Sequence, residues 1–153
     1  MRVVSAFSGT ENKGAYIRVT TTNNEVLAES EHIYEKDSEF IRLTSSFVLE
    51  TAQSVKVQLL VSGKGTVYFD APQLENNPYA NAYNMLENGN FELGTGWTRN
   101  GAYYTSGTRF NMSRSMYING NVEYNRYAYQ EYLLNWEKYQ DKKWQIDFMD
   151  LYQ

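Results

Sequence analysis

Tyrosine and arginine side chains are the groups of this chain best suited to chemistry, and that chemistry is ligand binding. Aromatic residues make up 16% of the sequence, and 14 of them are tyrosines. A tyrosine ring has a flat apolar face and a polar tip, which suits a wet binding surface and equally the surface of a β-sheet. Sugar binding requires exposed aromatic faces with amide, carboxylate or arginine partners. The candidate carbohydrate-binding residues are Tyr103, Tyr104, Arg99, Arg114 and Trp136.

The pair Tyr103 and Tyr104 is the most informative of these candidates. Adjacent residues of a strand point to opposite faces of the sheet, so we expect one of the two rings to lie outward. Trp97 is expected to lie in the core. No spacing among these residues selects a particular sugar, and a surface that binds no sugar remains an open alternative.

Catalytic groups are poorly represented. His32 is the only histidine, so a Ser-His-Asp arrangement would have to use it. It lies in an acidic segment without a Gly-x-Ser-x-Gly turn, and the chain has no P-loop or Rossmann glycine pattern. Carboxylates are numerous, but no spacing selects a pair for glycoside hydrolysis. We therefore predict that the protein is not an enzyme.

The overall composition argues against several classes of protein. The absence of cysteine rules out disulfides, thiol nucleophiles and cysteine-bound zinc. The formal net charge is −4 and no basic stretch is present, which argues against nucleic-acid binding. No apolar run approaches the ~18 residues of a membrane span, and the first residues lack the apolar region of a signal peptide. We accordingly expect no membrane insertion, and we expect the chain to be an internal fragment of a longer protein.

Alternating apolar and polar residues predict strands along most of the chain. The clearest is 54–62, in which Val55, Val57, Leu59 and Val61 point one way. The segment 129–140 lacks glycine and proline, so a helix is an open alternative there. The predicted strands are 15–22, 26–28, 40–49, 54–62, 66–70, 103–104, 114–118, 127–134 and 143–152.

These strands, with turn residues between them, predict an all-β antiparallel sandwich. The 153 residues suit one domain of this kind. Its predicted core includes Val57, Leu59, Phe69 and Phe91.

Two sequence motifs resemble the junction between modules in Rhs/YD-repeat wall-associated surface proteins of Gram-positive bacteria. GTVYFDAPQLE, at Gly65–Glu75, resembles the end of a jelly-roll module similar to family 4/9 carbohydrate-binding modules. YNMLENGNFELGTGW, at Tyr83–Trp97, resembles the start of the next module. The resemblance implies a galactose-binding-like jelly roll outside the cell, at the cell surface or in the cell wall. It implies a non-catalytic carbohydrate-binding-like module, or else a structural spacer or protein-interaction module without a sugar site.

The position of the junction implies an unusual arrangement of modules. Residues 1–80 resemble the late half of one module, and residues 83–153 resemble the early half of the following one. Together they would form one circularly permuted sandwich domain, 1–153. We expect the halves to close within one chain as a permuted monomer, in preference to a strand-swapped dimer.

The same resemblance implies a structural calcium ion. Carried over to this sequence, its acidic ligands are Asp70 and Glu92, which suit Ca²⁺ as hard oxygen donors. Many relatives have two adjacent aspartates where this chain has Asp70 and Ala71, so one ligand is missing. The alternative is that both carboxylates bond backbone amides at strand ends.

Overall fold

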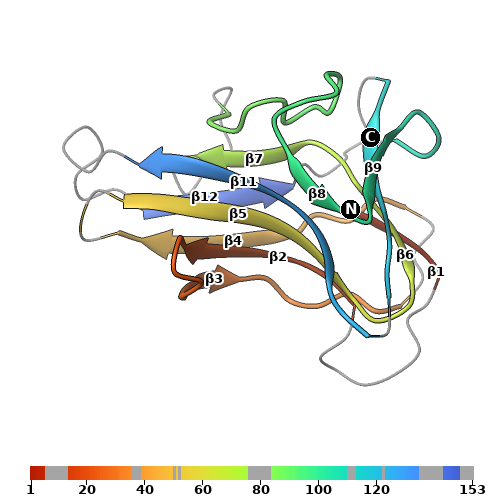
Figure 1. Ribbon diagram of the computed structural model, residues 1–153, viewed down its shortest axis with the longest axis horizontal. Helices are drawn as coiled ribbons and strands as arrows, with labels where there is room; N and C mark the ends of the chain where they lie inside the picture. Colours follow the sequence, from red (N-terminus) through yellow and green to blue (C-terminus); the bar gives the residue numbers. More distant parts are fainter. Residues whose placement is uncertain are drawn as a thin grey trace.

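The computed structural model describes residues 1–5, 14–35, 39–49, 51, 53–75, 84–109, 113–121, 123–134 and 143–148. Over these residues the chain forms twelve β-strands (Figure 1). None of the described residues belongs to a helix that could cross a membrane. The strands are β1 (Arg2–Ser5), β2 (Gly14–Thr21), β3 (Val26–Glu29), β4 (Thr44–Val48), β5 (Gln53–Ser62), β6 (Thr66–Phe69), β7 (Pro72–Glu75), β8 (Thr98–Asn100), β9 (Ala102–Thr105), β10 (Ser115–Asn119), β11 (Arg126–Leu134) and β12 (Lys143–Phe148).

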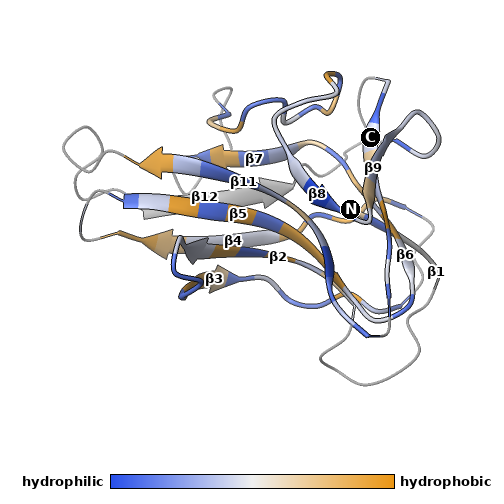
Figure 2. Cartoon of the chain, in the orientation of Figure 1, coloured by the Kyte–Doolittle hydropathy of each residue, from blue (hydrophilic) through white to orange (hydrophobic). Residues whose placement is uncertain are grey.

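The largest sheet of the described residues has five strands in the order β3-β2-β5-β11-β8, and all neighbours are antiparallel. Its central strand, β5, alternates hydrophobic and hydrophilic residues (Figure 2). The apolar residues of this alternation, from Val55 to Val61, are fully buried, as the sequence predicts. Burial of this one side gives the sheet an inner face and an outer face.

Two smaller antiparallel sheets complete the described fold. One has the order β1-β6-β10-β9 and the other has the order β4-β12-β7. A two-residue connection joins these sheets, because only Asp70 and Ala71 separate β6 of the first from β7 of the second. Ala71 has φ of 50°, a left-handed conformation that is uncommon outside glycine. Figure 1 shows β4 and β12 behind β2 and β5, so the sheets pack as an antiparallel β-sandwich.

The hydrophobic core lies between these layers. The predicted core residues Val57, Leu59, Phe69 and Phe91 are each 0% exposed, which confirms their placement. Trp97 is also buried, and its ring centroid lies 5.5 Å from that of Phe91. Aromatic pairs at this distance add packing energy beyond their buried area.

Every sheet of the described residues joins strands of residues 1–80 to strands of residues 83–153. In the five-stranded sheet, β11 lies between β5 and β8; in the four-stranded sheet, β10 lies between β6 and β9; in the three-stranded sheet, β12 lies between β4 and β7. Residues 1–80 and residues 83–153 therefore pair with each other within this chain.

Several boundaries differ from the sequence prediction. The predicted strand 40–49 begins only at Thr44, because Ile41 instead exchanges two backbone hydrogen bonds with Met1. The helical alternative for 129–140 is wrong over 129–134, which belong to β11. The short strands β7 and β8 were not predicted. Pro72 occupies the first position of β7, where a missing N–H is tolerated. Residues 76–82 and 149–152 lie outside the described residues.

Candidate functional site

The outer face of the five-stranded sheet carries polar and aromatic side chains in register. Arg18 of β2 is paired with Gln58 of β5, and Gln58 is paired with Tyr129 of β11. Tyr129 is in turn opposite Thr98 of β8. Residues that are directly opposite in an antiparallel sheet share a face. We name Arg18, Gln58, Tyr129 and Thr98 the central row.

Two tyrosines of β11 supply the aromatic surface of this face. The ring centroids of Tyr127 and Tyr129 are 5.8 Å apart, with an interplanar angle of 42°. Lys56 Nζ lies 5.4 Å from the centroid of the Tyr129 ring, which is a cation–π distance. Lys56 is also paired with Glu131 across β5 and β11. An ammonium, a carboxylate and two half-buried aromatic rings thus lie close together.

Gln58 occupies the middle of the central row, between Arg18 and Tyr129. Its carboxamide oxygen is buried and has no hydrogen-bond donor among the described residues. A buried acceptor without a donor costs about 1 to 3 kcal/mol. A water molecule or a ligand hydroxyl that reached this group would remove that cost.

The segment 30–35, which follows β3, forms one border of this face. It runs along β2, where Ala15 and Ile33 exchange two backbone hydrogen bonds of 2.9 Å. A Cβ on Gly14 would lie 2.5 Å from the Ile33 carbonyl oxygen, so only glycine fits beside this segment. His32 stacks on the ring of Tyr16 and leaves it 2% exposed, although Tyr16 is not part of the core cluster.

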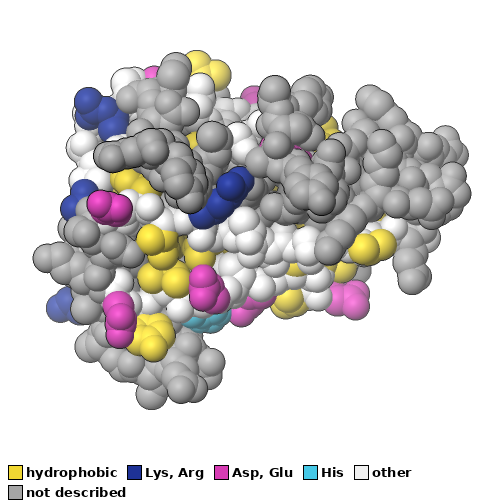
Figure 3. Space-filling view, turned by 180° about the vertical axis from the view of Figure 1, so that it is seen from behind, with side chains coloured by type: hydrophobic (Ala, Val, Ile, Leu, Met, Phe, Trp, Pro, Cys, Tyr) yellow, Lys and Arg dark blue, Asp and Glu magenta, His cyan; other side chains and the backbone are white. Residues whose placement is uncertain are grey.

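Glu29 connects His32 to Arg18. One of its carboxylate oxygens lies 2.8 Å from His32 Nε2, and the other accepts a 2.6 Å hydrogen bond from Arg18 Nε. Partial burial by itself would raise the pKa of Glu29, but the hydrogen bonds from His32 and Arg18 outweigh it and hold the pKa below its ordinary value. The positive charge of Arg18 is therefore balanced by an ionised neighbour. Figure 3 shows the histidine side chain among carboxylates on the molecular surface.

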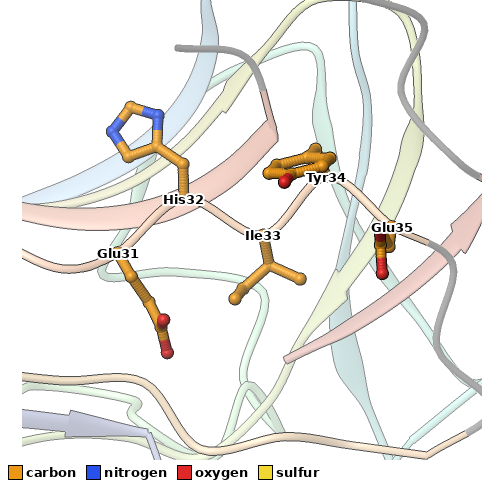
Figure 4. Close-up of a pocket in the computed structure, with 5 residues that line it drawn as sticks. All are labelled: Glu31, His32, Ile33, Tyr34 and Glu35. Atoms are coloured by element: carbon orange, nitrogen blue, oxygen red, sulfur yellow. The ribbon is translucent and has the colours of Figure 1, made fainter. Parts of the chain in front are cut away.

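A depression of about 270 Å³ adjoins this border and is lined by residues 31–35 (Figure 4). In that view, the side chains of Glu31 and His32 point to opposite sides of the segment. The described lining comes from five consecutive residues of one segment. It therefore lacks the polar groups converging from different elements that mark a small-molecule site.

The predicted sugar-binding tyrosines lie on different faces. Tyr103 is 57% exposed on the outer face of the four-stranded sheet. Tyr104 faces the core, where its ring centroid lies 6.2 Å from that of Phe91. Its hydroxyl donates a 3.0 Å hydrogen bond to the carbonyl oxygen of Thr95. The expectation that one of the two rings lies outward is confirmed.

The predicted arginines are also separated. Arg99 lies with Tyr104, with its guanidinium carbon 4.6 Å from the ring centroid. Arg114 is exposed before β10, and its backbone N–H donates to Glu92. Trp136 lies outside the described residues. The structure thus brings Arg99 to Tyr104 and leaves Tyr103 on another face.

Tyr103 has aromatic neighbours on its own face. Tyr117 of β10 is directly opposite both Tyr103 of β9 and Tyr68 of β6. The ring centroids of Tyr68 and Tyr117 are 5.2 Å apart, with an interplanar angle of 56°. We name Tyr68, Tyr117 and Tyr103 the tyrosine row; it is a second aromatic surface, separate from the central row.

The predicted calcium ligands are both hydrogen-bonded to the protein. Asp70 is 1% exposed, and its Oδ1 accepts a 2.8 Å hydrogen bond from the Ala71 amide. Glu92 accepts from the Ser113 hydroxyl, the Ser113 amide and the Arg114 amide, and these bonds lower its pKa. Calcium takes about 6 to 8 oxygen ligands, and the described residues contain no group of three acidic or histidine side chains placed to hold a metal. These side chains alone do not complete a calcium shell, and the ion stays a prediction.

No protein-family model, curated protein or solved structure matches the chain. The resemblance to surface-protein modules stays a prediction from the two motifs.

A side chain of the second motif, 83–97, forms hydrogen bonds to backbone groups of β7. Asn84 Oδ1 accepts hydrogen bonds from the amides of Leu74, at 3.1 Å, and Leu86, at 3.0 Å. Its Nδ2 donates a 2.8 Å bond to the carbonyl of Pro72. This asparagine thus fixes the start of the motif against β7, and the motif has a structural explanation of its own.

Proposed function

We propose that the chain is a non-catalytic carbohydrate-binding-like module of a bacterial cell-surface or wall-associated protein. The observation that carries the proposal is the central row, in which Tyr129 lies on an outer sheet face between an amide and a hydroxyl, with a guanidinium on the far side of the amide. A sugar ring presents apolar C–H groups to an aromatic face and hydroxyls to polar neighbours, so it fits this combination. The two motifs that resemble surface-protein modules support the extracellular location and the jelly-roll topology.

The charges of this face indicate a neutral glycan. Arg18 forms an ion pair with Glu29, and Lys56 lies opposite Glu131 in the register of β5 and β11. Because each cation has a carboxylate neighbour, an acidic sugar would gain little and would meet like charge. Gln58, with both donor and acceptor groups, suits hydroxyls rather than ions.

A structural spacer is the second candidate, and it has an observation in its favour. Asn84 and Glu92 of the 83–97 motif hold the protein's own backbone. A module conserving only these contacts would keep its fold without binding sugar.

A glycan array followed by calorimetry with the best neutral oligosaccharide separates the two candidates. Tyr129→Ala should weaken binding by about 0.5 to 1.5 kcal/mol, the contribution of one aromatic contact. Leu133→Ala, on the same strand and exposed, is the matched control and should bind normally. Loss of binding in Tyr103→Ala with normal binding in Tyr129→Ala would move the site to the tyrosine row. An array without any bound glycan would favour the spacer.

A further inference from the structure

Three asparagines of the chain are followed by glycine: Asn88, Asn100 and Asn119. Glycine has no side chain to shield its backbone nitrogen and adopts many conformations, so that nitrogen can reach the carboxamide of the preceding asparagine. Asparagine is a thermally labile residue for this reason. The three dipeptides share this local chemistry, and the fold holds each of them differently.

Asn88 is fixed by its side chain. Its Nδ2 donates hydrogen bonds to the carbonyl oxygens of Leu93, at 2.6 Å, and Thr95, at 2.8 Å. Its Oδ1 accepts a 3.0 Å bond from the Leu93 amide. The carboxamide cannot turn towards the Gly89 nitrogen unless these three bonds break.

Asn119 is restrained mainly through its glycine. The Gly120 amide donates a 2.7 Å hydrogen bond to the Gly65 carbonyl oxygen, which occupies the N–H of the nitrogen that would attack. The Asn119 carboxamide oxygen also lies 3.5 Å from the hydroxyl of Thr66.

Asn100 lacks restraints of either kind. It is the exposed last residue of β8, which is the edge strand of the five-stranded sheet. Its carboxamide makes no hydrogen bond to the described part of the chain. Gly101 has φ of 68°, and a Cβ placed there would lie 2.8 Å from Arg126 Nε. The Arg126 side chain therefore packs against Gly101, and its positive charge would favour the negative charge that develops when the Gly101 nitrogen loses a proton.

We propose that Asn100 is a site of spontaneous deamidation. The Gly101 nitrogen loses its proton to water and attacks Cγ of Asn100, and the bond from Cγ to Nδ2 breaks to release ammonia. Water then opens the resulting cyclic imide at either carbonyl. The products are aspartate and isoaspartate, and in total one amide and one water become one carboxyl group and one ammonia.

The modification would alter the edge of the proposed sugar-binding face. Asn100 is paired with Tyr127, so a new carboxylate would lie beside an aromatic ring of that face. Isoaspartate also adds a methylene to the backbone of β8 and would weaken its pairing with β11. The effect on sugar binding rests on the proposed function, whereas the modification itself does not.

Tandem mass spectrometry of the full folded chain, incubated in mildly alkaline buffer, tests the proposal. We expect Asn100 to convert roughly tenfold or more faster than Asn88, because Asn88 reacts only after local opening. In denaturant the three sites should react at similar rates, which shows that the fold sets the order. Arg126→Met should slow conversion of Asn100 in the folded chain. Equal conversion of the three sites when folded, or an intact Asn100 in a chain that reacts at the other two, would overturn the proposal. This readout needs no ligand, so a failure of the proposed function would leave it unaffected.

Discussion

The rings of Tyr16 and His32 stack almost parallel, with centroids 3.8 Å apart and planes 6° apart. This contact attaches the segment 30–35 to β2 at the border of the proposed sugar-binding face. His32 also holds Glu29, which in turn holds Arg18. One side chain thus contributes both an aromatic contact and a polar contact to the position of Arg18 in the central row.

Removal of the imidazole should loosen this border. His32→Ala is expected to lower the free energy of unfolding by about 0.5 to 1.5 kcal/mol, the range of one aromatic pair. His32→Phe, the control, keeps a ring on Tyr16 and loses the bond to Glu29, so it should retain most of the stability. Urea denaturation measures both changes. Equal losses in the two variants would show that the Glu29 contact, not the stacking, supports the segment.

The lowered pKa of Glu29 makes part of the stability dependent on pH. A carboxyl group whose pKa is lower in the folded chain than in the unfolded chain stabilises the fold above its unfolded pKa. That stability is lost as the pH falls through the folded value. Between neutral and acid pH, the wild type should therefore lose more unfolding free energy than Glu29→Gln does. Urea denaturation at a series of pH values tests this, and parallel curves for the two proteins would contradict it.

The strand pattern could be predicted from sequence far better than the site. Val55 to Val61 alternate with polar residues, and a period of two is a local property that any strand with one buried face shows. The pairing of Gln58 with Tyr129 is not local, because it depends on the register between strands that are distant in sequence. The same limit applies to Tyr103 and Tyr117. Sequence alternation could separate Tyr103 from Tyr104, but it could not show which rings lie across from them.

Gln130 should contribute more to the free energy of unfolding than a polar side chain usually does. It is buried on β11, its Oε1 accepts a 2.7 Å bond from the Glu87 amide, and its Nε2 donates to the carbonyls of Glu87 and Gly96. Gln130→Met keeps the shape and leaves these groups without partners. We expect a loss of about 1 to 3 kcal/mol in unfolding free energy. Hydrogen exchange should show faster exchange of the Glu87 amide, and an unchanged rate there would contradict the role.

Metal removal separates the two roles considered for Glu92. If it only holds Ser113 and Arg114, Glu92→Gln should lower the melting temperature equally in calcium and in chelator. A calcium ion bound by Asp70 and Glu92 would stabilise the native chain by mass action. Chelator would then lower the melting temperature of the wild type and leave that of Glu92→Gln unchanged. We expect the first pattern, because three hydrogen bonds already occupy the Glu92 carboxylate.

The pairing between the two halves of the chain in every described sheet leads to a prediction about its association state. Each of β10, β11 and β12 pairs with strands of residues 1–80, so an open half would expose unpaired edges and an apolar face. The eight residues between β7 and Asn84 need only reverse the chain, because the Met85 amide returns to the Leu74 carbonyl at 3.0 Å and Asn84 bonds the Leu74 amide. Closure within one chain also benefits from a high effective concentration. We therefore expect light scattering at low concentration to show a monomer.

Shortening this connection provides the decisive control. Removal of residues 78–81 leaves four residues to reverse the chain between Glu75 and Asn84, and short hinges favour strand exchange between copies. The shortened variant should form a dimer, whereas insertion of a Gly-Ser pair at the same place should leave a monomer. A dimer of the unaltered chain that persists on dilution, with strands of one copy completing the sheets of the other, would contradict the permuted monomer. A monomeric shortened variant would instead show that the connection does not decide how the two halves meet.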